Sequence, residues 1–246
     1  HLTVHLEPHD LSPELPVSLA RLHWKLSVGD RLVLDVADRS WPPERLVDLL
    51  VGAGFDPGRP RSVSPAGRRL AARRLRTLPD TVGPGMRVLV CGLNPSLVAA
   101  DAGYGYAGRN NRFWPAALAA GLVTVARDPL HALLAEGVGM TDLVKRATPG
   151  ASVLSGDEYR LGLARVRRLV EWLVPDRMLF VGLAGWRAAV DRSAAPGWQP
   201  SGDRAGGTAL PVPAYVMPST SGLNARTSLA ELAAHMEVAL GPPPVA

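Results

Sequence analysis

The stretch MRVLVCGLNPS, residues 86–96, decides how the chain folds. Its apolar run from Val88 to Cys91 has the length and composition of a buried strand. The run ends abruptly at Asn94, Pro95 and Ser96, and Pro95 cannot donate to a continuing strand ladder. We therefore expect a core strand whose end carries polar side chains.

Downstream of this strand, apolar strands and amphipathic helices alternate. We expect helices at 111–120, 128–137, 157–174, 183–192 and 228–240, and further strands at 177–182 and 212–218. This alternation predicts a parallel sheet that is covered by helices on both faces. In such sheets ligands bind beyond the carboxyl ends of the strands. The loops at 92–96, 182–185 and 218–222 should therefore form one site.

Upstream, residues 1–56 read as a small N-terminal α/β appendage. A helix is expected at 17–25, a strand at 30–37 and a helix at 43–55. The fragment weakly resembles the C-terminal part of a class I methyltransferase-like fold, although it lacks a glycine-rich cofactor loop. Residues 57–85 are rich in Pro, Gly, Ser and Arg and predict a basic linker with a short helix inside it. Residues 86–246 form the main domain.

Composition narrows the classes of partner and compartment. The net charge is +5 and the pI about 10.0, which is compatible with a polyanionic partner. The single cysteine, Cys91, excludes a disulfide within the chain and suits a reducing cytoplasm, where we expect a buried thiol. No apolar run approaches the length of a membrane span, so no membrane partner is expected.

Two of the three loops carry groups that suit a ligand. The first, 92–115, holds several glycines and asparagines, and Tyr104 or Tyr106 would form one wall of a flat pocket. The third, 217–228, combines hydroxyls with Arg226 ahead of a helix N-terminus, which suits a phosphate or an ordinary capped turn. The sequence has no Walker loop, no G-x-G-x-x-G after a strand, no zinc-ligand spacing and no G-x-S-x-G elbow. No cofactor or metal is therefore expected.

The motifs GLNPS, NRFW, GVGMTDLVKR, LFVGLAGW and VMPSTSGLNARTSLAEL occur in this order over residues 86–241. Together they resemble the mismatch-specific uracil/thymine-DNA glycosylases of the uracil-DNA glycosylase superfamily. The resemblance implies a three-layer α/β/α sandwich with a short, mainly parallel sheet. It also implies a monomer that hydrolyses the N-glycosidic bond of uracil, thymine or a damaged pyrimidine opposite guanine in double-stranded DNA, as a step of base excision repair.

The resemblance also implies a role for individual residues. Asn94 would place the attacking water, and Leu223 would enter the gap left by the flipped base. Because Ser219 stands where a histidine would stabilise the departing base, we expect a slow enzyme. A non-catalytic module that recognises flipped or abasic DNA is the alternative. The implied base-binding residues are Leu93, Pro95, Tyr106, Ser219 and Thr220, and the implied wedge and phosphate residues are Gly222, Leu223 and Arg226.

Overall fold

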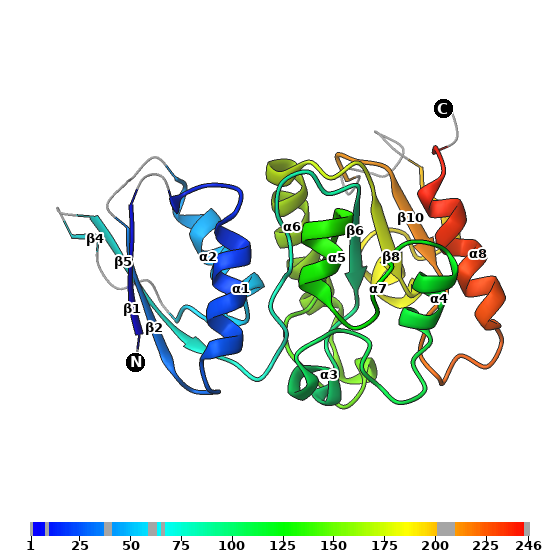
Figure 1. Cartoon of the computed structure of the whole chain (residues 1–246), viewed down its shortest axis with the longest axis horizontal. Coiled ribbons are helices and arrows are strands. Elements are labelled where there is room, and N and C mark those ends of the chain that lie inside the picture. The colour runs from blue at the N-terminus through cyan, green and yellow to red at the C-terminus, as the bar shows by residue number, and fades with distance from the viewer. Residues whose placement is uncertain are drawn as a thin grey trace.

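The computed structural model describes residues 2–7, 10–36, 41–58, 63–64, 67–200 and 210–243. Its described part contains two sheets side by side, one in an N-terminal unit that ends at Arg74 and one in a C-terminal unit that begins at Val88 (Figure 1). Residues 75–87 connect the two units.

The sheet of the C-terminal unit is mainly parallel, as predicted. It has the order β7-β6-β8-β10-β9, in which only β9 runs antiparallel to its neighbour. β7 and β9 were not expected. Gly139 obscures β7 in the sequence, and it is needed because a Cβ there would overlap the Sδ of Met86. The strands are β6 (Val88–Gly92), β7 (Val138–Asp142), β8 (Met178–Val181), β9 (Gly197–Trp198) and β10 (Ala214–Met217).

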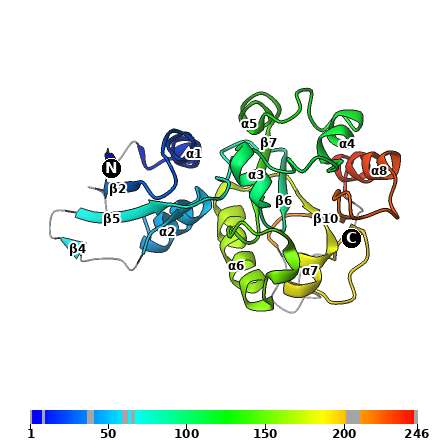
Figure 2. The same cartoon turned by 90° about the horizontal axis from the view of Figure 1, so that it is seen from below.

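Helices cover both faces of this sheet, which confirms the three-layer α/β/α sandwich. Seen from below, α4 (Phe113–Ala119), α5 (Pro129–Glu136) and α8 (Leu229–Leu240) lie on one side, and α6 (Gly156–Leu173) and α7 (Leu183–Ala189) on the other (Figure 2). The short α3 (Leu97–Ala102) and a 3₁₀ turn, η2 (Ala151–Val153), complete the helices that the structure describes in the C-terminal unit.

Strand alternation divides the core between these two faces. Val88 and Val90 of β6 pack in the cluster that includes α4 and α8, whereas Leu89 and Cys91 pack in the cluster that includes α6. The thiol of Cys91 is buried, as expected, with the residue only 1% exposed.

The N-terminal unit corrects the expected linker. Residues 67–74 do not form a basic helix but strand β5, which pairs antiparallel with β2 across six residues. The residues of this strand alternate with a period of two, since Leu70 and Ala72 are buried while Arg69 and Arg73 are exposed. This alternation is the sequence signal of a strand. The sheet order is β1-β2-β5-β3 with β4 also on β5. The elements are β1 (Leu2–Leu6), α1 (Leu15–Lys25), β2 (Arg31–Val36), α2 (Pro43–Gly52), β3 (Phe55–Asp56), β4 (Val63–Ser64) and β5 (Gly67–Arg74).

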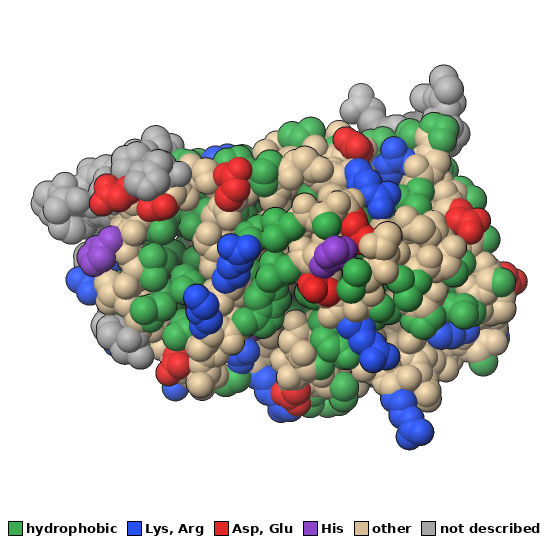
Figure 3. All heavy atoms as spheres, viewed as in Figure 1, with side chains coloured by type: hydrophobic (Ala, Val, Ile, Leu, Met, Phe, Trp, Pro, Cys, Tyr) green, Lys and Arg blue, Asp and Glu red, His purple; other side chains and the backbone are tan. Residues whose placement is uncertain are grey.

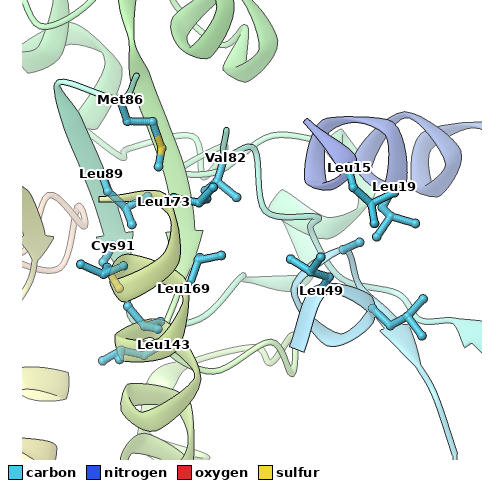
Figure 4. Packing of buried hydrophobic residues seen from close by; sticks show 14 of the residues in the cluster. Leu15, Leu19, Leu49, Val82, Met86, Leu89, Cys91, Leu143, Leu169 and Leu173 are labelled. Carbon is cyan, nitrogen blue, oxygen red and sulfur yellow. The ribbon is translucent and has the colours of Figure 1, made fainter. Parts of the chain in front are cut away.

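The two units share one hydrophobic core. Leu15 and Leu49 of the N-terminal unit belong to the same buried cluster as Val82 and Leu169 (Figure 4). At the end of α2, the Gly52 carbonyl accepts a 2.7 Å hydrogen bond from the backbone N–H of Asp80. The N-terminal unit is therefore packed against the C-terminal unit rather than tethered to it.

Candidate active site

A cavity of about 410 Å³ opens at the carboxyl end of β6. It gathers the segment after β6, the loop that follows α3, the end of β7 and the loop before α8. These segments come together because β6, β7, β8 and β10 are parallel strands whose carboxyl ends lie at the same edge of the sheet. The lining residues include Gly92, Leu93, Asn94, Pro95, Ser96, Tyr106, Arg109, Asn110, Asn111, Asp142, Ser221, Gly222 and Leu223.

The side chain of Asn94 is held in one orientation. Its Nδ2 donates to the backbone carbonyl of Arg146 at 3.0 Å and to Thr148 Oγ1 at 2.8 Å, and the Pro95 carbonyl lies within 3.1 Å. Two of these partners are carbonyls, which can only accept, so the nitrogen must face them. The Oδ1 receives no hydrogen bond from any residue that the structure describes. It is therefore available to accept one from a water in the cavity.

Thr148 anchors this arrangement and was missed by the sequence analysis. Its hydroxyl accepts from Asn94 and donates to the Gly150 carbonyl at 2.8 Å, and its backbone N–H donates to the Pro95 carbonyl at 3.1 Å. Thr148 is only 2% exposed. It lies 54 residues from Asn94 in the chain, so only the pairing of β6 with β7 brings the two together.

Tyr106 forms one wall of the cavity. Its ring stacks on Phe113 with centroids 4.0 Å apart and planes inclined by 15°. Phe113 covers one ring face, and Tyr106 also lines the cavity. The backbone of Tyr106 has φ +61°, a strained value for a residue other than glycine. Neighbouring contacts hold this loop, since Trp114 Nε1 donates to the Gly105 carbonyl at 2.9 Å and Trp24 Nε1 to the Gly103 carbonyl at 3.1 Å.

Asp142 places a carboxyl group in the cavity. It ends β7 directly opposite Gly92, where a Cβ would overlap Asp142 Oδ1 and approach the hydroxyl of Tyr106 at 3.1 Å. Burial raises the pKa of Asp142 to about 6. Lys145, whose Nζ is 4.0 Å from Oδ2, and Arg165 offset only part of this rise, and the charge of Asp80 adds to it. The sequence analysis did not assign Asp142 to the site, because the strand that ends with this residue, β7, was not expected.

A buried ion cluster supports this end of the sheet. Asp80 receives Lys145 Nζ at 2.8 Å, Arg165 Nη1 at 2.6 Å and the hydroxyl of Thr141 at 2.8 Å. Burial alone would raise the pKa of Asp80, but Arg165 and Lys145 outweigh it and hold the pKa below its ordinary value. Arg165 also donates to the backbone carbonyl of Asp142 at 2.8 Å. The cluster thereby fixes the backbone that carries Asp142.

The loop before α8 presents Leu223 to solvent. Leu223 is 97% exposed, the highest exposed fraction among the large hydrophobic residues that the structure describes. Gly222 lies against Asn110, and a Cβ at Gly222 would come within 2.6 Å of the Cβ of Asn110. Arg112 clamps the loop by donating to the carbonyls of Ser221, Asn224 and Thr227. The exposed leucine therefore stands on a rigid support.

The structure brings together most of the predicted site residues. Leu93, Asn94, Pro95, Tyr106, Gly222 and Leu223 all line the cavity. Ser219, Thr220 and Arg226 do not line it. Ser219 and Thr220 instead support the loop, since the Ser219 carbonyl accepts from Asn224 Nδ2 at 2.8 Å and that of Thr220 from the N–H of Arg112 at 2.9 Å. Arg226 is exposed on the same loop.

Within the described ranges, no group of three or more His, Cys, Asp or Glu side chains could hold a metal ion. No helix in the same ranges is long and apolar enough to cross a membrane. Residues 79–240 of the 246 match a family model described as the uracil DNA glycosylase superfamily. The match covers the cavity and both loops that flank it. The protein therefore belongs to the uracil DNA glycosylase superfamily, whose members are DNA glycosylases, hydrolases that act in DNA repair.

Proposed function

We propose that this protein is a monofunctional, mismatch-specific glycosylase that removes uracil paired with guanine in double-stranded DNA. Damaged pyrimidines and, more slowly, thymine opposite guanine are further substrates of the same site. The observation that carries the proposal is the anchoring of Asn94, whose Nδ2 is occupied by fixed acceptors while Oδ1 is left to position a water.

The rest of the cavity supports the same chemistry. A flipped pyrimidine would lie against Tyr106, whose opposite face already rests on Phe113. Leu223 would fill the space that the base leaves in the helix and offset part of the cost of unstacking. An amide binds water but is a weak base, so Asn94 would orient the water rather than remove its proton strongly.

The leaving base would receive little help from this chain. The departing pyrimidine gains negative charge in the transition state, while Ser219 does not line the cavity and Asp142 contributes a carboxyl group to it. We infer a slow enzyme that depends on a good leaving group and on a weak base pair. This favours uracil over thymine and a G·U pair over A·U.

The test uses duplexes that carry G·U, A·U, G·T or hypoxanthine, followed by alkaline cleavage of abasic sites. We expect scission at G·U first, and we expect Asn94→Ala to lower the single-turnover rate by a hundredfold or more, the order of a lost positioned group. Gln199→Ala is the control for a general effect on folding, because this amide also donates to two backbone carbonyls, those of Ala195 and Gly197, but lies outside the cavity lining. Tight binding to G·U duplexes without scission by the unmodified protein would instead favour a non-catalytic DNA-binding module.

A further inference from the structure

The N-terminal unit carries three exposed cations near the cavity. Lys25 ends α1, Arg31 begins β2, and Arg73 lies near the end of β5. Among the residues that the structure describes, none of the three has an acidic ion-pair partner. The nearby carboxylates are engaged locally, since Asp30 accepts from the N–H of Ser27 and Asp56 from that of Gly58. We call Lys25, Arg31 and Arg73 the basic edge.

The strand register places two arginines of this edge side by side, while Asp56 of β3 lies opposite Arg73 on the other side of β5. β2 and β5 pair antiparallel with Arg31 directly opposite Arg73, and like charges at such positions destabilise a sheet. Elsewhere on the same pair of strands the register is complementary, because Asp35 lies opposite Arg69 and the two side chains form an ion pair of 3.5 Å. A facing pair of arginines is consistent with an anionic ligand at this point.

The basic edge adjoins the cavity on the same side of the molecule. The turn between α1 and β2 lies at the same lower side as α3 and the carboxyl end of β6 (Figure 1). Trp24, next to Lys25, donates to the Gly103 carbonyl of the loop that carries Tyr106. Lys and Arg side chains gather over α1 and below it, toward α3, in the space-filling view (Figure 3).

We propose that the basic edge is a second DNA contact, which binds the phosphates of the duplex that flanks the flipped nucleotide. This inference rests on the proposed function, which places a nucleotide in the cavity. A duplex seated there presents a regular row of phosphates, and the edge supplies cations beyond the C-terminal unit. The N-terminal unit would thereby lengthen the DNA footprint on one side.

The test measures the affinity of the full chain for a duplex without uracil, so that excision plays no part. Arg31→Gln with Arg73→Gln should weaken binding roughly tenfold at about 0.1 M salt and should lower the slope of log K against log salt by about 2, since each phosphate contact contributes about 0.9. The control for net charge is Arg167→Gln with Arg192→Gln, which removes the same charge from α6, where Arg167 pairs with Glu171 at 3.1 Å, and from the turn after α7. Neither control residue lines the cavity.

A second readout separates binding from structure. Arg31→Gln alone removes the like-charge pair and keeps the 3.2 Å hydrogen bond from Arg73 Nε to the Gly29 carbonyl. This single variant should therefore have an unchanged or higher melting temperature and a lower affinity for DNA. In a separate duplex that carries one G·U pair, bound by proteins that also carry Asn94→Ala so that excision is slow, shortening the DNA on one side of the uracil should abolish the effect of the Arg31 and Arg73 substitutions. Equal losses in the test and control pairs, or a melting temperature that falls together with affinity, would overturn the proposal.

The failures of the two proposals are distinguishable. Normal excision of uracil with unchanged affinity in the Arg31/Arg73 variant would overturn the basic edge and leave the glycosylase function standing. If the Arg31 and Arg73 substitutions weaken duplex binding but the wild type excises no uracil, the proposed function is overturned and the basic edge is supported as a DNA contact.

Discussion

Replacing Asp142 by Asn should make the protein more stable at pH 8 but not at pH 4. The carboxyl group has a pKa of about 6 in the folded chain against an ordinary value of 3.8. That difference corresponds to about 3 kcal/mol, taking ~1.4 kcal/mol for each pKa unit. The folded state therefore binds this proton more tightly than the unfolded state does. The loss of folding stability caused by ionised Asp142 is absent below about pH 4, grows between pH 4 and 6 and is complete above pH 6.

The assay is urea denaturation of wild type and Asp142→Asn at pH 4 and pH 8. The variant keeps the side-chain volume, so the gain at pH 8 should approach ~3 kcal/mol and should vanish at pH 4. Asp101→Asn is the control with the opposite sign, because a hydrogen bond from Arg76 lowers the pKa of Asp101. That control should lose stability at pH 8. Equal destabilisation of Asp142→Asn at both pH values would refute the reasoning.

The same carboxyl group should shape the pH dependence of excision, given the proposed function. Ionised Asp142 would repel the negative charge that grows on the departing base, whereas protonated Asp142 can donate a hydrogen bond. The single-turnover rate of wild type should therefore fall as pH rises through about 6. Asp142→Asn should lack this fall and should be faster than wild type at pH 8, by about tenfold for ~1.4 kcal/mol. A persistent fall in the variant would assign the titration to another group.

Two further substitutions test the wedge and the anchor. Leu223→Ala should lower excision from a G·U duplex by about tenfold and leave excision from single-stranded DNA nearly unchanged, because only the duplex must be unstacked. The control is Leu161→Ala on α6, since Leu161 is also exposed. An equal loss on both substrates would argue against a wedge. Thr148→Val removes an acceptor of Asn94 Nδ2 at constant volume, so kcat should fall about tenfold with KM unchanged. A rise in KM alone would instead place Thr148 in substrate binding.

The position of the site could be predicted from the sequence because it depends on local signals. The apolar run that stops at Asn94 and Pro95 marks a strand end, and alternation with helices makes the sheet parallel. Carboxyl ends of parallel strands meet at one edge, so Leu223 could be expected beside Asn94 although the two are far apart in the chain. These inferences need only the direction of each strand.

The anchor of Asn94 could not be predicted because it depends on strand order. Thr148 reaches Asn94 only because β7 pairs with β6, and β7 lacks both a clear period and a long apolar run. In the sequence, Gly139 indicates a break in a strand. In the structure it lies within β7, because the Sδ of Met86 occupies the space that a Cβ would need. β5 was not predicted for a different reason. Its arginines outnumber its buried residues, and a segment so rich in charge resembles a linker.

The N-terminal unit is best understood as part of the site's framework. The strained backbone of Tyr106 persists only if its surroundings over-determine it, and one of the bonds that fix this loop comes from Trp24 of that unit. A second link joins Arg76, just after β5, to Asp101 of α3 at 2.5 Å. The wall of the cavity is thus held from both units. Loss of the N-terminal unit should therefore loosen the loop that carries Tyr106, even though Asn94 and its acceptors belong entirely to the C-terminal unit.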